Sequence, residues 1–317
     1  MRKLTILIIL AVVLFLAVFL WWNNGLSSVN SKDTTQKFFV IPKGMAIRTV
    51  GNELKKQGLI KDPVVFFLYI KLNNLDHAIQ AGSYKLSPAM GLSKIMYTLG
   101  HGTIDIWVTI PEGYRAEEIA SILKENIPTY QVSWVGRLVA EEGYLFPDTY
   151  LIPKDADIDS IISLFENNFY AKIGTIGLTK SSPTLRKSII EASLVEREAK
   201  FAEDRPYVAS VIQNRLKEGM ALQIDATVQY TVGYNVVSKK WWNQPQPYQL
   251  KIESAYNTYI NTGLPPAPIC NPGLSAIAAA NNPSDTNYIY YVNDSKGKLH
   301  FAQNLSDHNK NIQKYLN

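Results

Sequence analysis

Apolar residues form one long N-terminal run and shorter periodic stretches further along the chain. The run covers residues 4–22, LTILIILAVVLFLAVFLWW, and contains no charged residue. A helix needs about 20 consecutive apolar residues to cross the hydrocarbon core of a bilayer. The pattern therefore predicts one transmembrane helix over residues 4–22.

The residues that flank this run predict its orientation. Arg2 and Lys3 precede it, and Trp21 and Trp22 close it. Positive residues favour the cytoplasmic side of a membrane, and tryptophan favours the interface. We therefore expect a single-pass protein of the plasma (inner) membrane, with residues 1–3 in the cytoplasm, residues 4–22 in the membrane and the chain after Asn23 outside the cytoplasm. A cleaved signal peptide is the alternative, but its apolar part is usually about 7–15 residues long and precedes small residues.

Residues 23–37 are small and polar and show no apolar periodicity, which predicts a linker. Residues 38–104 then alternate between strand and helix patterns. A strand is expected near Phe39, a helix is expected to begin at Asp62 with Pro63 in its first turn, and AGSYKL predicts another short strand. This strand-helix-helix-strand pattern resembles a LysM-like carbohydrate-binding module, although small α+β units serve many purposes.

The start of this module has an internal counterpart. The segments FVIPKGMAIRTVGNELKK, from Phe39, and VTIPEGYRAEEIASILKE, from Val108, both pass from a strand through an Ile-Pro-x-Gly turn into an amphipathic helix. Their matching glycines are Gly44 and Gly113. The sequence therefore predicts two related strand-turn-helix units.

Residues 105–317 are expected to form a larger mixed α+β domain, so the predicted fold class of the whole chain is α+β. Its most distinctive segments are EEGYLFPDTY, DRPYVASVIQNRLKEGM, LQIDATVQY, AYNTYINTGLPPAPICNPG, YIYYVND and HFAQNLSDHN. Aromatic and amide side chains are dense in the loops between these segments. They suit a sugar, whose apolar faces stack on rings and whose hydroxyls bond amides; ordinary half-buried packing is the alternative.

Composition narrows the chemistry. The 317 residues are 46% hydrophobic and 19% charged, which is ordinary globular material. The one cysteine, Cys270, excludes an internal disulfide, and the four histidines show no HExxH or paired spacing. We therefore expect no metal and no cofactor. The net charge of +5 is modest, and no Arg-rich or aromatic RNA-binding motif indicates nucleic acid as a partner.

The segment SSPTLRKSIIEASLVEREAKFAEDRP places several glutamates in an apolar helical context. Ser182 suits an N-cap and Pro183 the first turn, which predicts a helix from Pro183 to about Phe201. At about 100° per residue, Glu198 lies in the middle of the apolar stripe. Glu196 lies about 160° away from it and is expected on the solvent face.

This geometry selects Glu198 as a candidate general acid. A carboxyl on the solvent face keeps a pKa near about 4.3, whereas one that faces an apolar cleft is desolvated and has a raised pKa. Only a carboxyl that holds its proton near neutral pH can protonate a leaving glycosidic oxygen. The alternative is a structural carboxylate bonded to the backbone or to Arg205. Glu191 shares the same face two turns earlier. The remaining carboxylates considered are equally explained as cap or turn residues: Glu142, Asp148 and Asp225.

Four ordered motifs carry a family resemblance: EASLVEREA, VASVIQNRLKEGMALQIDATVQY, YNTYINTGLPPAPICNPGLSAI and HFAQNLSDHN. Together they closely resemble the endolytic murein transglycosylases of the MltG (YceG-like) family, and the similarity covers nearly the whole chain. Residues 105–317 then correspond to the YceG-like catalytic domain. In that family the catalytic glutamate is the second of a Glu-x-Glu pair, which maps onto Glu198 and agrees with its helical position.

The resemblance implies cleavage of the β-1,4 bond between N-acetylmuramic acid and N-acetylglucosamine in nascent peptidoglycan strands. The product carries a 1,6-anhydromuramyl end, and the step terminates glycan elongation. A single acid, Glu198, suffices because the C6 hydroxyl of the muramyl unit is the nucleophile. Penicillin-binding proteins are the partners that the family implies. Five further residues match family positions that we place around the sugar, with a scaffold role as the alternative: Asp148, Gln223, Asp225, Asn257 and Tyr259.

Two other functions fit parts of the sequence. A non-catalytic, membrane-tethered glycan-binding scaffold of cell-wall synthesis would keep the LysM-like unit and lack the acid at Glu198, which is present. A serine acyltransferase acting on the wall peptide would use the S-x-x-K motif of Ser121 and Lys124. No K-T-G or S-D-N motif accompanies that serine, and this spacing arises easily by chance on a helix.

Overall fold

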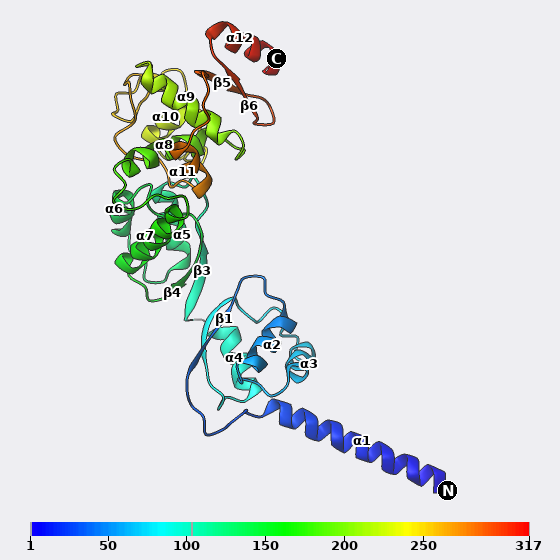
Figure 1. Ribbon diagram of the computed structural model, residues 1–317. Coiled ribbons are helices and arrows are strands. Elements are labelled where there is room, and N and C mark those ends of the chain that lie inside the picture. The colour runs from blue at the N-terminus through cyan, green and yellow to red at the C-terminus, as the bar shows by residue number, and fades with distance from the viewer. Residues whose placement is uncertain (1, 103, 317) are drawn as a thin grey trace. The chain divides into compact units, whose positions relative to one another are not determined.

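The computed structural model describes residues 2–102 and 104–316 of the chain (Figure 1). It divides into two compact units. Unit 1 contains Met1–Val108 and Tyr150–Asp155, and unit 2 contains Thr109–Thr149 and Ala156–Asn317. Helices and strands occur in both units, so the predicted α+β class is confirmed. Three residues of the predicted segments 1–3, 38–104 and 105–317 lie outside the described part of the chain: Met1, Thr103 and Asn317.

The N-terminal helix α1 covers Arg2–Leu26 and extends beyond the predicted residues 4–22. Its part Ile6–Leu26 is long and apolar enough to cross a membrane. Large apolar side chains along it are exposed, for example those of Leu14 and Phe15, as is expected of a helix that lipid surrounds. The helix fits a single-pass membrane anchor, and its orientation stays a prediction.

Unit 1 is built on a sheet packed against helices. Its other elements are β1 (Lys37–Ile41), α2 (Ile47–Lys56), α3 (Pro63–Leu72), β2 (Gly82–Leu86), α4 (Leu92–His101), β3 (Asp105–Thr109) and β4 (Thr149–Pro153). The sheet order is β1-β2-β3-β4, and β1 and β2 are antiparallel. Strands and helices share one buried core, which includes Phe39, Leu54, Phe66, Tyr84 and Ile95. The order β1-α2-α3-β2 matches the predicted strand-helix-helix-strand pattern, whereas a LysM-like identity stays a prediction.

The chain passes between the two units through β3 and β4. The sequence placed residues 105–108 and 150–155 in the larger domain, whereas the structure places them with unit 1. The reason is that β3 and β4 complete the sheet of unit 1. Sequence periodicity marks a strand but does not state which sheet it joins.

The predicted linker of residues 23–37 differs from the structure at both ends, because residues 23–26 belong to α1 and Lys37 begins β1. The Lys61 ammonium donates a hydrogen bond to the Asn24 side chain at 3.0 Å. The Asn30 N–H donates to the Pro88 carbonyl, also at 3.0 Å. Polar residues without periodicity therefore find hydrogen-bond partners on the module surface, which composition does not reveal.

Unit 2 is mainly helical. Its helices are α5 (Ala116–Asn126), α6 (Trp134–Ala140), α7 (Ile158–Gly174), α8 (Leu185–Glu198), α9 (Arg205–Lys217), α10 (Asp225–Val232), the 3-10 helix η1 (Gln249–Lys251), α11 (Leu274–Asn281) and α12 (Leu305–Tyr315). Strands β5 (Tyr290–Asn293) and β6 (Leu299–Ala302) form an antiparallel hairpin. Helix α8 packs against α9 and α11 (Figure 1). Its residues Ile189, Ala192 and Leu194 are fully buried in the core of the unit.

One predicted helix cap and two predicted turns of the N-terminal half of the chain lie where the sequence indicates them. The Asp62 carboxylate accepts hydrogen bonds from the N–H groups of Val64 and Val65 and so caps α3. The matching glycines of the two Ile-Pro-x-Gly turns, Gly44 and Gly113, have positive φ angles of 83° and 74°. Glycine adopts such angles at low cost. Each turn leads into a helix, α2 or α5, so the two predicted strand-turn-helix units are confirmed.

Candidate active site

Glu198 is the last residue of α8. The helix covers Leu185–Glu198 and is shorter at both ends than the predicted 183–201. Ser182 is not its N-cap, because its hydroxyl accepts a hydrogen bond from the backbone of the preceding loop. At the other end Ala199 has an extended conformation, with φ −107° and ψ 106°, which ends the helix. Glu198 therefore projects from the C-terminal end of the helix.

A cavity of about 390 Å³ opens beside Glu198. This volume is typical of small-molecule sites, which span roughly 300–1,000 Å³. The lining residues come from α8, α9, α10, β5, α12 and adjoining loops: Arg197, Glu198, Arg215, Gln223, Asp225, Ala226, Gln229, Tyr259, Tyr291, Asn293 and His308. Four of the six residues selected from the sequence meet here: Glu198, Gln223, Asp225 and Tyr259.

The Glu198 carboxyl is held by a hydrogen bond and has a raised pKa. The Tyr291 hydroxyl donates to its Oε2 atom at 2.9 Å. Desolvation raises the pKa of Glu198 to about 7, and the charge of Asp225 adds to the rise. The Tyr291 hydrogen bond and the charges of the two cavity arginines oppose it. Glu198 is therefore protonated in a large fraction of the molecules near neutral pH, as a general acid requires.

The second carboxylate of the cavity, Asp225, lies in the first turn of α10. Its Oδ1 atom accepts a hydrogen bond of 2.6 Å from the Tyr259 hydroxyl. Gln223, two residues earlier, has a positive φ of 49°, which is uncommon for a residue other than glycine. Its backbone N–H donates to the Thr258 carbonyl at 3.0 Å. The two loops are thus tied together and present Asp225 and Tyr259 to one cavity.

Asp148 and Asn257 lie elsewhere in unit 2. Neither is among the described residues that line this cavity. Asp148 accepts a hydrogen bond from the Asn168 amide at 3.0 Å and pairs with the Lys172 ammonium at 3.2 Å. Asn257 is fully buried, and its amide donates to two backbone carbonyls of the preceding loop. Asn257 therefore shapes the loop that carries Tyr259.

The prediction that Glu196 faces solvent is wrong. Its side chain is 6% exposed and pairs with Arg205 at 2.8 Å. Its other oxygen accepts a hydrogen bond from the Gly273 N–H at 3.0 Å, at the start of α11. Ser193, on the same helical face, is also buried. Because α8 packs against both α9 and α11, it lacks the single solvent face that a helical wheel assumes.

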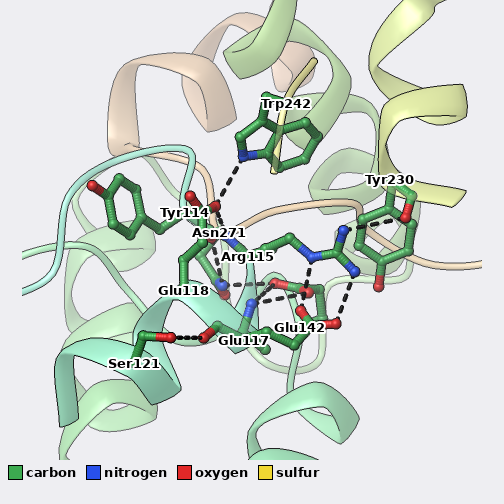
Figure 2. Close-up of polar contacts among 10 residues, drawn as sticks. Tyr114, Arg115, Glu117, Glu118, Ser121, Glu142, Tyr230, Trp242 and Asn271 are labelled. Atoms are coloured by element: carbon green, nitrogen blue, oxygen red, sulfur yellow. Dashed lines mark hydrogen bonds and ion pairs between the residues drawn. The ribbon is translucent and has the colours of Figure 1, made fainter. Parts of the chain in front are cut away.

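Three more buried carboxyls have raised pKa values but do not line the cavity, those of Glu142, Glu191 and Glu196. Burial raises the pKa of Glu142 to about 8 and that of Glu191 to about 7. Figure 2 shows Glu142 beside Asn271, whose amide donates to it at 2.8 Å. The Ala116 N–H also donates to Glu142, at 3.0 Å. A raised pKa therefore does not by itself mark the site; Glu198 differs because it opens onto a cavity.

Two other kinds of site were considered, a nucleophilic serine and a metal site. The Ser121 hydroxyl, from the S-x-x-K motif, donates to the Glu117 carbonyl at 3.0 Å within α5 (Figure 2). This is a common helix-surface contact of serine. Among the side chains that the structure describes, those of residues 6–100, 102 and 104–316, no group of three or more His, Cys, Asp or Glu residues is placed to hold a metal ion.

Six polar residues of the lining are not among the site residues predicted from the sequence: Arg197, Arg215, Gln229, Tyr291, Asn293 and His308. The spacing of residues along one helix or strand could have predicted two of them. Gln229 follows Asp225 by four residues on α10, and Asn293 follows Tyr291 by two residues on β5, so each pair shares one face of its element. The approach of Tyr291 to Glu198 has no such signal, since 93 residues separate them.

Comparison with known proteins agrees with the motifs. The YceG-like family model matches residues 39–314. The chain is 32% identical to an endolytic murein transglycosylase of Bacillus subtilis (strain 168), over 94% of this chain and 90% of that protein. It is 29% identical to an endolytic murein transglycosylase of Streptococcus pneumoniae serotype 2, over 92% of this chain, and spans 61% of that longer protein. A crystal structure of a yceG-like protein from Listeria monocytogenes matches with a TM-score of 0.57 and 31% identity, covering 87% of this chain and 99% of that one. The chain therefore belongs to the YceG-like family.

Proposed function

We propose that this chain is an endolytic lytic transglycosylase of peptidoglycan. Relatives over most of the chain carry the name endolytic murein transglycosylase, which supports the proposal. The observation that carries it is the position of Glu198, which has a pKa of about 7 and opens onto a polar cavity. The bond cleaved is the β-1,4 linkage from N-acetylmuramic acid to N-acetylglucosamine in nascent strands. The product is a 1,6-anhydromuramyl end, and its formation stops elongation of the strand.

In the first step, Glu198 protonates the glycosidic oxygen as the bond from the muramyl C1 to that oxygen breaks. Tyr291 donates to Oε2 of Glu198. Oε2 is then the accepting oxygen of the neutral acid, which leaves the proton on Oε1 for the sugar. Positive charge develops at C1 and the ring oxygen. The carboxylate of Asp225, in the same cavity, stabilises that charge.

In the second step, the ionised Glu198 accepts the proton of the muramyl C6 hydroxyl as O6 bonds to C1. The anhydro ring closes, and Glu198 returns to its protonated form. The nucleophile belongs to the substrate, so no positioned water is required. Arg197 and Arg215 both lower the pKa of Glu198, which means that they stabilise its carboxylate between the two steps.

The remaining residues divide by location. We assign Gln223, Asp225 and Tyr259 to substrate contacts because they line the cavity. Asp148 and Asn257 receive scaffold roles, because their polar atoms bond neighbouring protein groups.

Unit 1 and α1 place the enzyme at its substrate. The β1-α2-α3-β2 order supports a LysM-like role in glycan binding for unit 1. Helix α1 would hold the chain at the outer face of the plasma (inner) membrane, where nascent strands emerge. Penicillin-binding proteins are the partners we propose there, on the basis of the family resemblance.

A non-catalytic glycan-binding scaffold is the second candidate, favoured by the strand-helix-helix-strand module and the apolar N-terminal helix.

One assay separates the lytic transglycosylase from the scaffold. The full chain in detergent micelles is incubated with uncrosslinked glycan strands, and the new ends are identified by mass spectrometry. We expect anhydro ends that disappear with Glu198→Gln and persist with Glu191→Gln. Glu191 is the matched control, since its pKa is also about 7 but it does not line the cavity. Reducing ends would indicate a hydrolase, and intact bound strands a scaffold.

A further inference from the structure

A second cavity, of about 240 Å³, is formed by α10 and the segment that follows it. Side-chain amides dominate its lining: Gln229, Asn235, Asn243, Gln244, Gln246 and Gln249. Two aromatic residues, Trp241 and Tyr248, also line it. The proposed chemistry at Glu198 does not use this cavity.

The lining defines the class of ligand. None of the described lining residues is charged, so a phosphate, a carboxylate or a metal ion would find no opposite charge there. Amides supply both hydrogen-bond donors and acceptors, and aromatic rings supply apolar faces. A neutral sugar with hydroxyl and acetamido groups needs this combination. The cavity is smaller than the roughly 300–1,000 Å³ of typical ligand sites, which suits a single sugar unit.

Trp241 is held in position by the buried Arg115. The guanidinium lies 4.6 Å from the centre of the Trp241 ring and 4.2 Å from that of Tyr230. Figure 2 shows how this guanidinium is fixed: the Glu117 carboxylate accepts two hydrogen bonds of 2.8 Å from it, and the Tyr230 carbonyl accepts a third at 3.2 Å. Arg115 is only 5% exposed. A ring fixed in this way loses little freedom when a sugar stacks on it.

The second cavity adjoins the first. Gln229 lines both of them. The Arg197 guanidinium, from the lining of the first cavity, lies 3.9 Å from the ring centre of Trp242. Trp242 follows Trp241 directly, and its ring N–H donates to the Glu118 carboxylate at 2.9 Å (Figure 2). A strand that binds at Glu198 can therefore extend into the second cavity.

We infer that the second cavity is a subsite for one N-acetylhexosamine unit of a strand whose scissile bond lies at Glu198. Trp241 and Tyr248 supply the stacking surface, and the surrounding amides bond the hydroxyl and acetamido groups. The inference rests on the proposed function, and it adds a preference for chain length. A strand that occupies both cavities binds more tightly than a fragment that fills only one.

The test uses the full chain in detergent micelles with Glu198→Gln, which prevents cleavage. Binding of chitohexaose and chitobiose, oligomers of β-1,4-linked N-acetylglucosamine, is measured by calorimetry before and after adding Trp241→Ala or Tyr248→Ala. Val237→Ala is the matched control, because Val237 belongs to the same segment, is 95% exposed and does not line the cavity. We expect binding of chitohexaose to weaken about tenfold in the two aromatic variants, as for the loss of one good stacking contact. Chitobiose binding and the control should not change.

Equal chitohexaose affinity in the aromatic variants and the control would overturn the inference. So would the absence of any chitohexaose binding to the Glu198→Gln chain. Neither result decides the proposed function, because cleavage by the unsubstituted enzyme is read separately by mass spectrometry of strand ends. Trp241 contacts Arg115, so its removal can also loosen the loop. Tyr248 is 74% exposed, so Tyr248→Ala keeps the test valid if Trp241→Ala unfolds.

Discussion

The Tyr291 hydroxyl donates a hydrogen bond of 2.9 Å to Oε2 of Glu198, across 93 residues of sequence. Tyr291 belongs to β5 of the C-terminal hairpin, and Glu198 ends α8. The environment of the proposed acid is therefore complete only when the hairpin packs onto the helical core. This contact lowers the pKa of a carboxyl that burial raises, so it adjusts the pH at which Glu198 gives up its proton.

Tyr291→Phe removes this hydrogen bond and keeps the ring. The pKa of Glu198 should rise above about 7, because the hydrogen bond lowers it. The acid then stays protonated to higher pH, and the alkaline limb of the pH–rate profile should move upward. We also expect kcat to fall about tenfold, because the hydroxyl no longer orients the carboxyl. The measurement is strand cleavage as a function of pH.

Tyr288→Phe is the control for this variant, because Tyr288 precedes the same hairpin but does not line the Glu198 cavity. Its pH profile should match that of the unsubstituted enzyme. A Tyr291→Phe enzyme with a lower kcat and an unmoved alkaline limb would show that Tyr291 only supports packing.

Asp225→Asn should shift the profile in the opposite direction. The Asp225 charge raises the pKa of Glu198, so its removal should lower that pKa and move the alkaline limb to lower pH. The Tyr259 hydroxyl, which donates to Oδ1 of Asp225 at 2.6 Å, can still donate to an asparagine oxygen. We expect a fall in kcat of about tenfold or more, since a negative charge near the developing cation is lost. An unchanged pH profile would place Asp225 outside the electrostatic field of the acid.

Glu196 and Glu198 should respond differently to the same change. Glu196→Gln breaks a buried ion pair with Arg205, and we expect it to lower the free energy of unfolding by about 3 kcal/mol. The folded fraction should still cleave strands. Glu198→Gln should abolish cleavage and stabilise the fold at pH 8. In the unsubstituted chain the pKa of Glu198 is raised in the folded state, so the folded protein loses stability as pH rises through about 7 and the buried carboxyl ionises. Glutamine does not ionise, so the variant does not lose this stability.

Chemical denaturation at pH 5 and pH 8, with cleavage measured per folded molecule, tests both variants. The advantage of Glu198→Gln over the unsubstituted chain should be greater at pH 8 than at pH 5. If Glu196→Gln is fully stable but does not cleave strands, the general acid is Glu196 and not Glu198.

Local rules in the sequence were sufficient for part of the fold. The Asp62 cap and the glycines at 44 and 113 were predictable because each depends on a few neighbouring residues. The solvent face of α8 was not predictable in this way. A helical wheel assigns faces from a pattern, and Glu196 breaks the pattern because Arg205 and the Gly273 N–H satisfy its charge inside the protein.

The candidate site shows the same division. The apolar residues around Glu198 on one helix predict that it is a candidate acid. They do not predict the cavity beside it. Tyr291 and His308 reach that cavity from the hairpin and α12. Their segments, YIYYVND and HFAQNLSDHN, are distinctive in the sequence, but only tertiary contacts decide which side chain of each segment faces the cavity.

Asn271→Ala should destabilise unit 2 without altering the Glu198 chemistry. Asn271 is fully buried. Its side-chain oxygen accepts hydrogen bonds from the N–H groups of Gly143 and Leu145, at 2.8 and 3.0 Å. Its amide donates to the Tyr114 carbonyl and the Glu142 carboxyl, at 3.0 and 2.8 Å. Removing the side chain leaves several buried polar groups unpaired, and we expect the free energy of unfolding to fall by about 3 kcal/mol.

The control for this change is Asn281→Ala, because Asn281 is exposed at the end of α11 and its loss should leave stability almost unchanged. Denaturant titration of both variants measures the difference. The alkaline limb of cleavage should stay at the same pH in Asn271→Ala, because Asn271 does not line the Glu198 cavity. If Asn271→Ala keeps its free energy of unfolding but shifts the alkaline limb of the pH–rate profile, the structural role of Asn271 is wrong. Asn271 would then influence the pKa of Glu198 through Glu142.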